Sequence, residues 1–404
     1  MYSDRKDTEM SDTQNEIFKC ISNGNIIELK SKLASHNGSI DFTDENGMTP
    51  LQHSAYKGSK EIVQLLLDLG ADVNSSKHEF HYTALHFAAL SGDHDVCLLL
   101  LSAGANPNAI NSVGRTPAQM GAFVSNHKAV STINNFVSIQ EIEYYTKIHG
   151  QETEPSLPPV LLDSFHKFVI YPNIHPVRIC LNLQKFGIPS KHYVTIKKIL
   201  QKMTEREMNR NKEINEIMAF KYHYLSWIIK EIIACHEHFE IRNRSKAVAQ
   251  NTKSEYLEMF VKRILKPNKE GQLDYVEIII RECVRDFEYR DCTIFQQIVR
   301  QLASKDTNIT ALDVIKQSLN GQRSFQDEYA FCKTCGEEKP DKKCSKCKQV
   351  QYCDRECQRL HWWMHKKECA RLSLTVPLET ASSNSKSEID QTEISSKLQK
   401  LMVG

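Results

Sequence analysis

Seven of the 13 cysteines in this 404-residue chain lie close together near its C-terminal end, with two histidines among them, of which only His365 has a ligand spacing. Two pairs have the C-x2-C spacing of zinc knuckles, and two later pairs have the spacings C-x3-C and H-x3-C. The x3 spacing places both members of a pair on one face of a helix. Thiolate sulphur and imidazole nitrogen are ligands that Zn²⁺ prefers, and eight of them are enough for two closed tetrahedral sites. The predicted zinc ligands are Cys332, Cys335, Cys344, Cys347, Cys353, Cys357, His365 and Cys369.

The spacing does not decide which four residues hold each of the two predicted Zn²⁺ ions. A segment of about 40 residues has almost no hydrophobic core of its own. We therefore expect zinc binding to supply most of the free energy that folds residues 332–369.

The charge of this segment argues against nucleic acid as its partner. It contains ten Lys or Arg and six Asp or Glu residues, but seven thiolates and two Zn²⁺ ions bring it close to neutral. The whole chain has a formal net charge of only +2. Because affinity for phosphate backbones depends on excess positive charge, we expect protein partners and no nucleic acid.

The other six cysteines are scattered singly, and we interpret them as buried and inert. The first residues, Met1-Tyr2-Ser3-Asp4, are not those of a signal peptide, and no apolar run approaches the ~20 residues that span a bilayer. These features predict a soluble intracellular protein in a reducing compartment, without direct membrane insertion.

No pattern of catalytic residues is evident. The chain has neither a glycine-rich phosphate loop nor a G-x-S-x-G nucleophile elbow. The sequence His236-Glu237-His238 lacks the H-E-x-x-H zinc spacing, because position 240 is Glu240. We therefore predict that the protein is not an enzyme and has no catalytic residues.

An internal repeat of 33 to 34 residues precedes the cysteine cluster by about 200 residues. Thr49-Pro50-Leu51 aligns with Thr83-Ala84-Leu85, and Thr116-Pro117-Ala118 begins a weaker third copy. Thr caps a helix, and Pro fits its first position because no N–H is needed there. One such unit cannot bury its apolar face alone, so copies stack. The predicted units are a capping repeat at 13–43, repeats at 44–74 and 78–108, and a degenerate repeat at 111–140.

The rest of the chain is predicted from composition and periodicity. Residues 150–189 are proline-rich and are either a polar linker or, over 159–188, a further diverged repeat. Residues 190–325 have helical periodicity, with a broad apolar face at 222–233 that indicates a bundle core. We predict disorder for the two ends, 1–12 and 373–404. The predicted fold is mainly α.

The repeats resemble ankyrin repeats, because their T-P-L-H-x-A-A and G-A-D-V-N motifs are both present, although Gln52 stands where the family has His. The resemblance implies a solenoid that binds proteins through the hairpin tips and the solvent side of the first helices. Exposed aromatic residues there would be the usual interface anchors. The implied surface residues are Glu45, Asn46, Met48, Tyr56, Lys57, Glu79, Phe80, Tyr82, Leu90, Val113, Arg115 and Phe123.

The cysteine cluster closely resembles a MYND-type zinc finger, with Tyr352 before Cys353 and with Gln358, Trp362 and His365 in its last helix. This resemblance implies interleaved zinc sites, with Cys332, Cys335, Cys353 and Cys357 on one ion and Cys344, Cys347, His365 and Cys369 on the other. It also implies that Gln358 and Trp362 line a groove for proline-rich peptides. A polyproline-II ligand suits such a groove because it is already extended and loses little conformational entropy on binding.

The whole layout is similar to the ankyrin-repeat and MYND-finger adaptor family. That resemblance implies a non-enzymatic adaptor that helps to deliver membrane signalling proteins, such as nucleotide cyclases, to cilia from the cytoplasm. The alternative is a nuclear transcriptional corepressor or scaffold that recruits proline-rich partners. A SET-type protein methyltransferase is disfavoured because the chain lacks the N-H-S-C-like cofactor motif.

Overall fold

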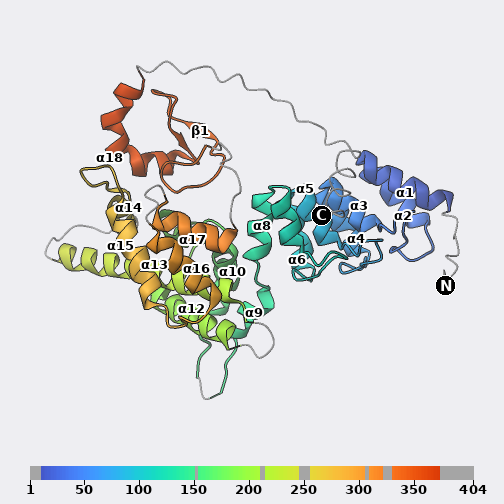
Figure 1. Cartoon of the computed structure of the whole chain (residues 1–404), viewed down its shortest axis with the longest axis horizontal. Helices are drawn as coiled ribbons and strands as arrows, with labels where there is room; N and C mark the ends of the chain where they lie inside the picture. The colour runs from blue at the N-terminus through green and yellow to red at the C-terminus, as the bar shows by residue number, and fades with distance from the viewer. Residues whose placement is uncertain are drawn as a thin grey trace.

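Helices form nearly all the regular structure of the protein, as described by a computed structural model. The structure describes residues 11–150, 153–209, 214–244, 255–304, 309–321 and 330–373. The N-terminal helices stack to one side of a larger helical domain, and the cysteine-rich segment lies above that domain in Figure 1. The predicted mainly α architecture is confirmed. None of the helices in the described ranges is long and apolar enough to cross a membrane.

The first eight helices form four antiparallel pairs that stack side by side. The first helices of the pairs pack in the order α1, α3, α5, α7, and the second helices pack α4 on α6 and α6 on α8. Their buried side chains form one continuous core. The bounds are α1 (Asp12–Asn23), α2 (Ile26–Ser35), α3 (Pro50–Lys57), α4 (Lys60–Asp68), α5 (Ala84–Ser91), α6 (His94–Ser102), α7 (Pro117–Phe123) and α8 (His127–Asn134).

Threonine caps the first helix of the three repeats after the capping repeat, as predicted, and in the first two of these the residue three positions later forms the hydrogen bonds that link neighbouring repeats. Gln52 accepts a hydrogen bond from the Thr49 amide at 2.9 Å, and its amide group donates to the carbonyls of Ser75 and Tyr82, both at 2.9 Å. His86 accepts from the Thr83 amide at 3.1 Å. Gln52 therefore links its own repeat to the next one, at the position where the ankyrin family has a histidine.

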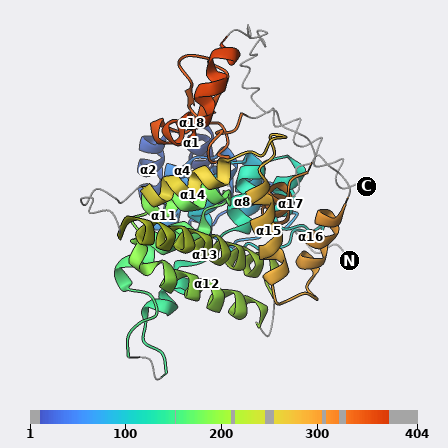
Figure 2. The same ribbon diagram turned by 90° about the vertical axis from the view of Figure 1, so that its left-hand side faces the viewer.

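The helical domain follows the stack and is built around the long helix α13. This helix packs against α11, α12, α14, α15, α16 and α17. Figure 2 shows α14, α13 and α12 one below another. The apolar face predicted at 222–233 is buried in this core. The bounds are α9 (Ile139–Glu143), η1 (Tyr144–Thr146), η2 (Pro159–Leu161), α10 (Leu162–Ile170), α11 (Pro176–Lys185), η3 (Ser190–His192), α12 (Tyr193–Met208), α13 (Glu216–Arg244), α14 (Glu255–Leu265), α15 (Asp274–Asp286), α16 (Thr293–Ala303) and α17 (Ala311–Asn320).

The proline-rich stretch is not a linker over residues 159–188. It forms η2, α10 and α11, whose residues Phe165, Val177 and Leu183 are fully buried in the core of the helical domain. The prolines mark helix starts, since Pro176 is at the first position of α11. The alternative of a further ankyrin unit also fails to describe the packing, because α11 contacts α13 and α14 rather than the repeat stack.

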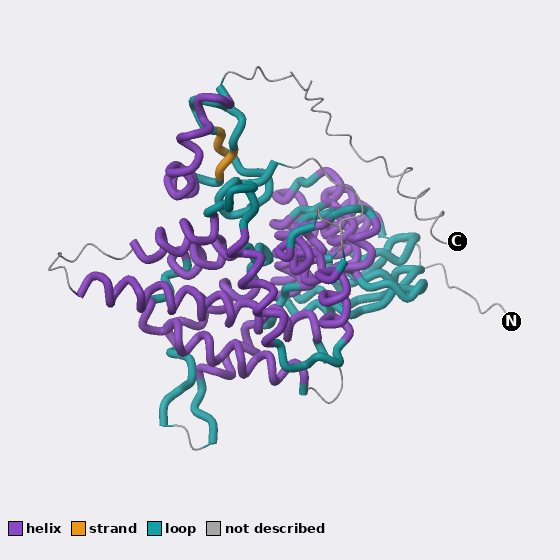
Figure 3. The backbone as a smooth tube through the Cα atoms, turned by 60° about the vertical axis from the view of Figure 1, so that its left-hand side comes forward, coloured by secondary structure: helices purple, strands orange, loops and turns teal. Residues whose placement is uncertain are grey.

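The cysteine-rich segment has a two-stranded antiparallel sheet and one helix. The strands are β1 (Lys342–Lys343) and β2 (Gln351–Tyr352), drawn in orange in Figure 3, and the helix is α18 (Arg355–Leu372). The predicted disordered ends lie outside the described residues, except for Ser11, Asp12 and Ser373. Ser11 caps α1 in a capping box and Asp12 lies in its first turn, so these two residues are ordered, contrary to the prediction.

A fully buried lysine, Lys221, lies in the core of the helical domain. Its ammonium group donates to the carbonyls of Val169 at 2.6 Å and Tyr171 at 3.2 Å, at the end of α10. Burial disfavours the charged form and lowers the pKa of Lys221 to about 7. The unfolded chain keeps the ordinary pKa near 10.5, so above pH 7 it binds a proton that the folded chain has released.

We expect this difference to make the folded chain more stable as the pH rises. Between pH 7 and pH 8 the wild type should gain about 1 kcal/mol of unfolding free energy relative to Lys221→Met, which has no titrating group. Urea unfolding of both proteins at pH 7, 8 and 9 measures the difference. The exposed Lys198→Met is the matched control and should follow the wild type; parallel pH profiles for wild type and Lys221→Met would contradict the prediction.

Candidate metal centre and protein-binding surfaces

The first group of predicted ligands comes together where the first knuckle meets the start of α18. Cys332 and Cys335 lie on the first knuckle, Cys353 follows β2, and Cys357 lies in the first turn of α18. Their sulphur atoms all lie within 4.8 Å of one another. The Sγ atom of Cys335 is 3.6 Å from that of Cys353 and 3.8 Å from that of Cys357. Four sulphurs each 2.3 Å from a central Zn²⁺ are about 3.8 Å apart, so this group fits one ion.

The second group combines the second knuckle with the C-terminal half of α18. The Sγ atoms of Cys344 and Cys369 are 3.8 Å apart. The Nε2 atom of His365 is 3.3 Å from Cys344 Sγ and 3.5 Å from Cys347 Sγ. All four side chains are buried. The interleaved pairing that the MYND resemblance implies is the pairing that the structure brings together, and the two groups fit two zinc ions.

The electrostatics of the second group suit a cation. Burial opposes ionisation, but the Cys347 amide, the His365 ring and the Lys346 amide lower the pKa of Cys344 to about 6. Burial and the neighbouring Cys344 raise the pKa of Cys369 to about 11. One thiolate therefore forms readily, and the next is disfavoured until a positive ion shares the charge.

One further histidine and one further cluster of metal-ligand residue types, among the described residues, are not part of these sites. His361 is buried beside the second site, but its Nδ1 atom is 3.0 Å from the Tyr352 hydroxyl and it belongs to neither ligand group. Asp93, His94 and Asp95 cluster at the start of α6. There the Asp93 carboxylate accepts the Asp95 and Val96 amides, so this cluster is explained as a helix cap.

The predicted peptide-binding residues lie on one face of α18. Gln358 and Trp362 are one helical turn apart. Gln358 is half-buried, and Trp362 is 40% exposed, with its ring edge-on to His365 at 5.9 Å between centroids. A zinc ligand therefore supports the exposed indole from beneath. The peptide role of these two residues remains a prediction.

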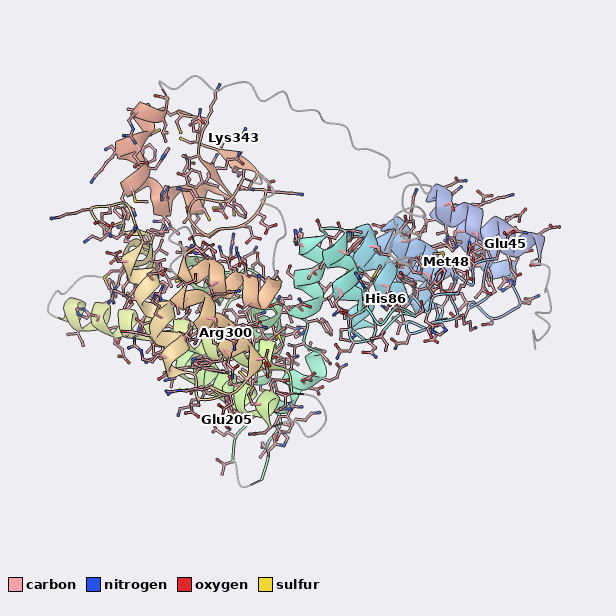
Figure 4. The ribbon with its side chains drawn as sticks, viewed as in Figure 1. Glu45, Met48, His86, Glu205, Arg300 and Lys343 are labelled. Atoms are coloured by element: carbon pink, nitrogen blue, oxygen red, sulfur yellow. The ribbon has the colours of Figure 1, made fainter. Side chains whose placement is uncertain are left out.

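Half of the residues predicted for the ankyrin surface are exposed, and all but one of the others are half-buried. Glu45, Asn46, Lys57, Glu79, Val113 and Phe123 are exposed, and Met48, Tyr56, Phe80, Leu90 and Arg115 are half-buried. Figure 4 labels Glu45 and Met48 in the first repeat and His86 in the second. The Arg115 guanidinium lies over the Phe123 ring at 5.6 Å. Ile110, which is 64% exposed, was not predicted and adds apolar area beside the same loop.

The prediction that Tyr82 is exposed is wrong, because its side chain is 6% exposed. His81 adopts a left-handed conformation with φ of 57° and turns the hairpin before Tyr82. The ring of Tyr82 then packs against Phe87 at 5.5 Å and His78 at 5.2 Å. Tyr82 therefore closes the core of the second repeat.

One residue at the metal centre is missed by reasoning from motifs. Arg178 in α11 is buried, and its guanidinium donates to the sulphurs of Cys335 and Cys353 in the first site. The signal in the sequence is a single charge between apolar residues, Val177 and Ile179. A buried charge of this kind needs a partner, but the sequence does not identify that partner.

Comparison with known proteins agrees with this architecture. Residues 15–132 match the ankyrin repeat family in three copies, and residues 332–369 match the MYND finger family. Dauer abnormal formation protein 25 of Caenorhabditis elegans is 30% identical over 338 residues, which is 81% of this chain and 83% of that protein.

Other relatives match shorter stretches. Ankyrin repeat and SOCS box protein 3 of Homo sapiens is 33% identical over 26% of this chain and 21% of its own length. A putative ankyrin repeat protein of Neisseria meningitidis serogroup B is 39% identical over 17% of this chain and 26% of its own length. Ankyrin repeats and MYND fingers are both protein-interaction modules, and the worm protein matches across most of the chain. The chain therefore belongs to the family of ankyrin-repeat proteins that carry a MYND finger.

Proposed function

We propose that this protein is a non-enzymatic adaptor that binds one partner at the ankyrin repeats and a second at the MYND finger. The observation that carries the proposal is an exposed aromatic anchor on each module, Phe123 on α7 and Trp362 on α18. Phe123 is 49% exposed and lies beneath the Arg115 guanidinium. Aromatic and arginine side chains are the residues that most often dominate binding energy at protein interfaces.

The partner proposed for the finger is a proline-rich peptide. The Trp362 indole offers a flat apolar surface, and Gln358, one turn earlier, offers an amide that can bond to a peptide backbone. A polyproline-II segment presents free carbonyls and apolar rings together, and it is already extended before it binds. The rings of such a peptide can pack on the Trp362 indole while one of its carbonyls accepts a hydrogen bond from the Gln358 amide.

The partner proposed for the repeats is a membrane signalling protein, such as a nucleotide cyclase, that the adaptor helps to deliver to the cilium. This part of the proposal is supported by the family resemblance and by the relative that matches most of the chain. The adaptor would act from the cytoplasm. The proposed surface has acidic, basic and apolar residues together, which suits a folded protein partner better than a uniformly charged one.

The test is partner recovery from ciliated cells with intact chain, Trp362→Ala and Phe123→Ala. Each substitution should weaken its own set of partners by about 30-fold and leave the other set unchanged, as expected for an anchor residue worth about 2 kcal/mol. The matched controls are Lys367→Ala, exposed on the side of α18 opposite Gln358, and Ile27→Ala, 82% exposed on α2.

Identical partners for all five proteins would show that both proposed surfaces are wrong. A panel of synthetic proline-rich peptides, titrated against intact chain and Trp362→Ala, tests the finger separately. Accumulation of the intact chain in the nucleus with repressor proteins would favour the corepressor alternative, and a catalytic activity of the purified protein would overturn the adaptor proposal.

A further inference from the structure

The buried arginine of the helical domain, Arg178, has an unusual position. Arg178 is 5% exposed and lies in α11 between Val177 and Ile179, which are 0% and 2% exposed. Guanidinium remains protonated at any pH at which the protein folds, so this helix places a permanent positive charge in an apolar core. Such a charge is tolerated only when an anion compensates for it.

The compensating anions come from the zinc finger. The Nη2 atom of Arg178 donates to Cys335 Sγ at 2.9 Å and to Cys353 Sγ at 3.1 Å. Its Nε atom forms an ion pair with the Glu337 carboxylate at 3.1 Å. The arginine thus joins two cysteines that are 18 residues apart in the sequence and belong to the same ligand group.

The charges of the two sites explain why the arginine serves the first one. Four thiolates around one Zn²⁺ leave two negative charges, whereas three thiolates and a neutral imidazole leave one. The first group has four cysteines, and the second has three cysteines and His365. A cation placed against the four-cysteine group therefore offsets the larger excess of negative charge.

The neighbours of Arg178 hold the same knuckle in place. Glu337 accepts hydrogen bonds from the Tyr171 hydroxyl at 3.2 Å and from the Asn173 amide group at 2.9 Å. The Asn173 amide group also donates to the Cys335 carbonyl at 3.2 Å. One short segment of the helical domain, 171–178, thus binds both the backbone and the side chains of the first knuckle.

The knuckle is shaped to approach this segment closely. Gly336 has φ of 65°, a left-handed conformation that favours glycine. A Cβ atom at this position would lie 3.2 Å from the His175 ring, which is closer than ordinary van der Waals contact. The knuckle and the helical domain are therefore fitted to each other at the first zinc site.

We propose that Arg178 is a positioning residue of the first zinc site, and that through it the helical domain stabilises the zinc-loaded form of the finger. Hydrogen bonds to metal-bound ligands fix their orientation and typically change metal affinity by 10- to 100-fold. The guanidinium lowers the negative charge on Cys335 and Cys353 and shields both sulphurs on the side that faces α11. The coupling is reciprocal. If contact with the helical domain strengthens zinc binding at the first site, then zinc binding must strengthen the contact between the finger and the helical domain to the same extent. This inference does not depend on what the finger binds.

The test measures zinc release from the full-length chain to a coloured chelator, after the loaded metal has been counted by mass spectrometry. Wild type should hold two ions. In Arg178→Gln, one of the two should leave at least tenfold faster, and in Arg178→Lys, which keeps the charge but not the two-sulphur contact, the acceleration should be smaller. Unchanged release of both ions from folded Arg178→Gln would overturn the proposal.

The matched control is Arg359→Gln. Arg359 on α18 pairs with Glu258 on α14, so it also links the finger to the helical domain, but it touches no zinc ligand. Release from Arg359→Gln should resemble the wild type; equal acceleration in both glutamine variants would mean that docking alone matters and that the sulphur contacts do not.

A second measurement covers the case in which Arg178→Gln does not fold. In the wild type, chelation should increase amide hydrogen exchange in 171–183 but not in the repeat helices, and unchanged exchange at 171–183 would contradict the coupling.

Discussion

Cys344→Ala will unfold the zinc finger while the ankyrin repeats keep their structure. Structural zinc contributes about 10–16 kcal/mol to the folding of isolated finger peptides, which is as large as the whole stability of a typical domain. The buried residues of the finger are mostly its metal ligands, so little else can hold it together. The repeats have a separate core in α1–α8 and should be unaffected.

Limited proteolysis with mass spectrometry measures the result. New cleavage sites should appear within 330–373 in Cys344→Ala and in wild type treated with a chelator. Two of the three tryptophans, Trp362 and Trp363, lie in the finger, so fluorescence gives an independent reading. The matched control is Cys283→Ala, which removes a buried cysteine of the helical domain that lies in neither ligand group. Equal protease resistance of the finger in Cys344→Ala and wild type would show that zinc does not hold it together.

His86→Gln will make the folding stability of the ankyrin repeats less dependent on pH below 7. The Nδ1 atom of His86 accepts the Thr83 amide, so its hydrogen is on Nε2 and is donated to the Arg115 carbonyl at 3.1 Å. Burial disfavours the charged ring and lowers the pKa of His86 to about 4, despite the opposing effect of the Arg115 carbonyl. The unfolded chain keeps the ordinary value of 6.5. The contribution of the neutral ring to folding stability is therefore complete above pH 6.5, and it is lost progressively as the pH falls from 6.5 through 4.

Between pH 7 and pH 5 the unfolding free energy of the wild-type repeats should fall by about 2 kcal/mol more than that of His86→Gln. Glutamine can accept from Thr83 and donate to Arg115, as Gln52 already does between its own repeat and the next. At pH 7 the two proteins should therefore differ little. Hydrogen exchange of α5 and α6 amides, corrected for intrinsic rates, measures the difference at each pH. His86→Ala is the control, because it leaves both backbone partners unpaired and should be less stable at every pH. Parallel pH profiles for wild type and His86→Gln would contradict the prediction.

Patterns within short stretches of sequence predicted most of the fold. Thr49, Thr83 and Thr116 begin helices because a threonine cap acts on residues only three positions away. The zinc ligands were predicted because chemistry restricts both their residue types and their spacing. The grouping of ligands required the MYND resemblance, since several pairings satisfy the same spacings.

Features that depend on distant parts of the chain were not predicted. Pro176 lies in a stretch that the sequence predicts to be a linker or a diverged repeat, because a proline at the first turn of a helix has the same local signature as a proline in a linker. Tyr82 was placed on the surface because the repeat pattern does not specify how the turn at His81 directs the next ring. Arg178 pairs with Cys335, which lies 157 residues away, and only the folded chain brings the two side chains together.

The contact between α8 and α17 fixes the ankyrin repeats to the helical domain. The open end of the last repeat packs against α17, and the Asn135 amide donates to the Asn320 side-chain carbonyl at 2.9 Å. A helix from another domain thus replaces the terminal capping repeat that a solenoid needs. Two proteins held at the repeats and at the finger would keep a defined separation, because each module is docked on the same helical domain. Each bound protein would then raise the effective concentration of the other. The size of the helical domain would set that effective concentration, as the length of the linker does in proteins whose binding domains are joined flexibly.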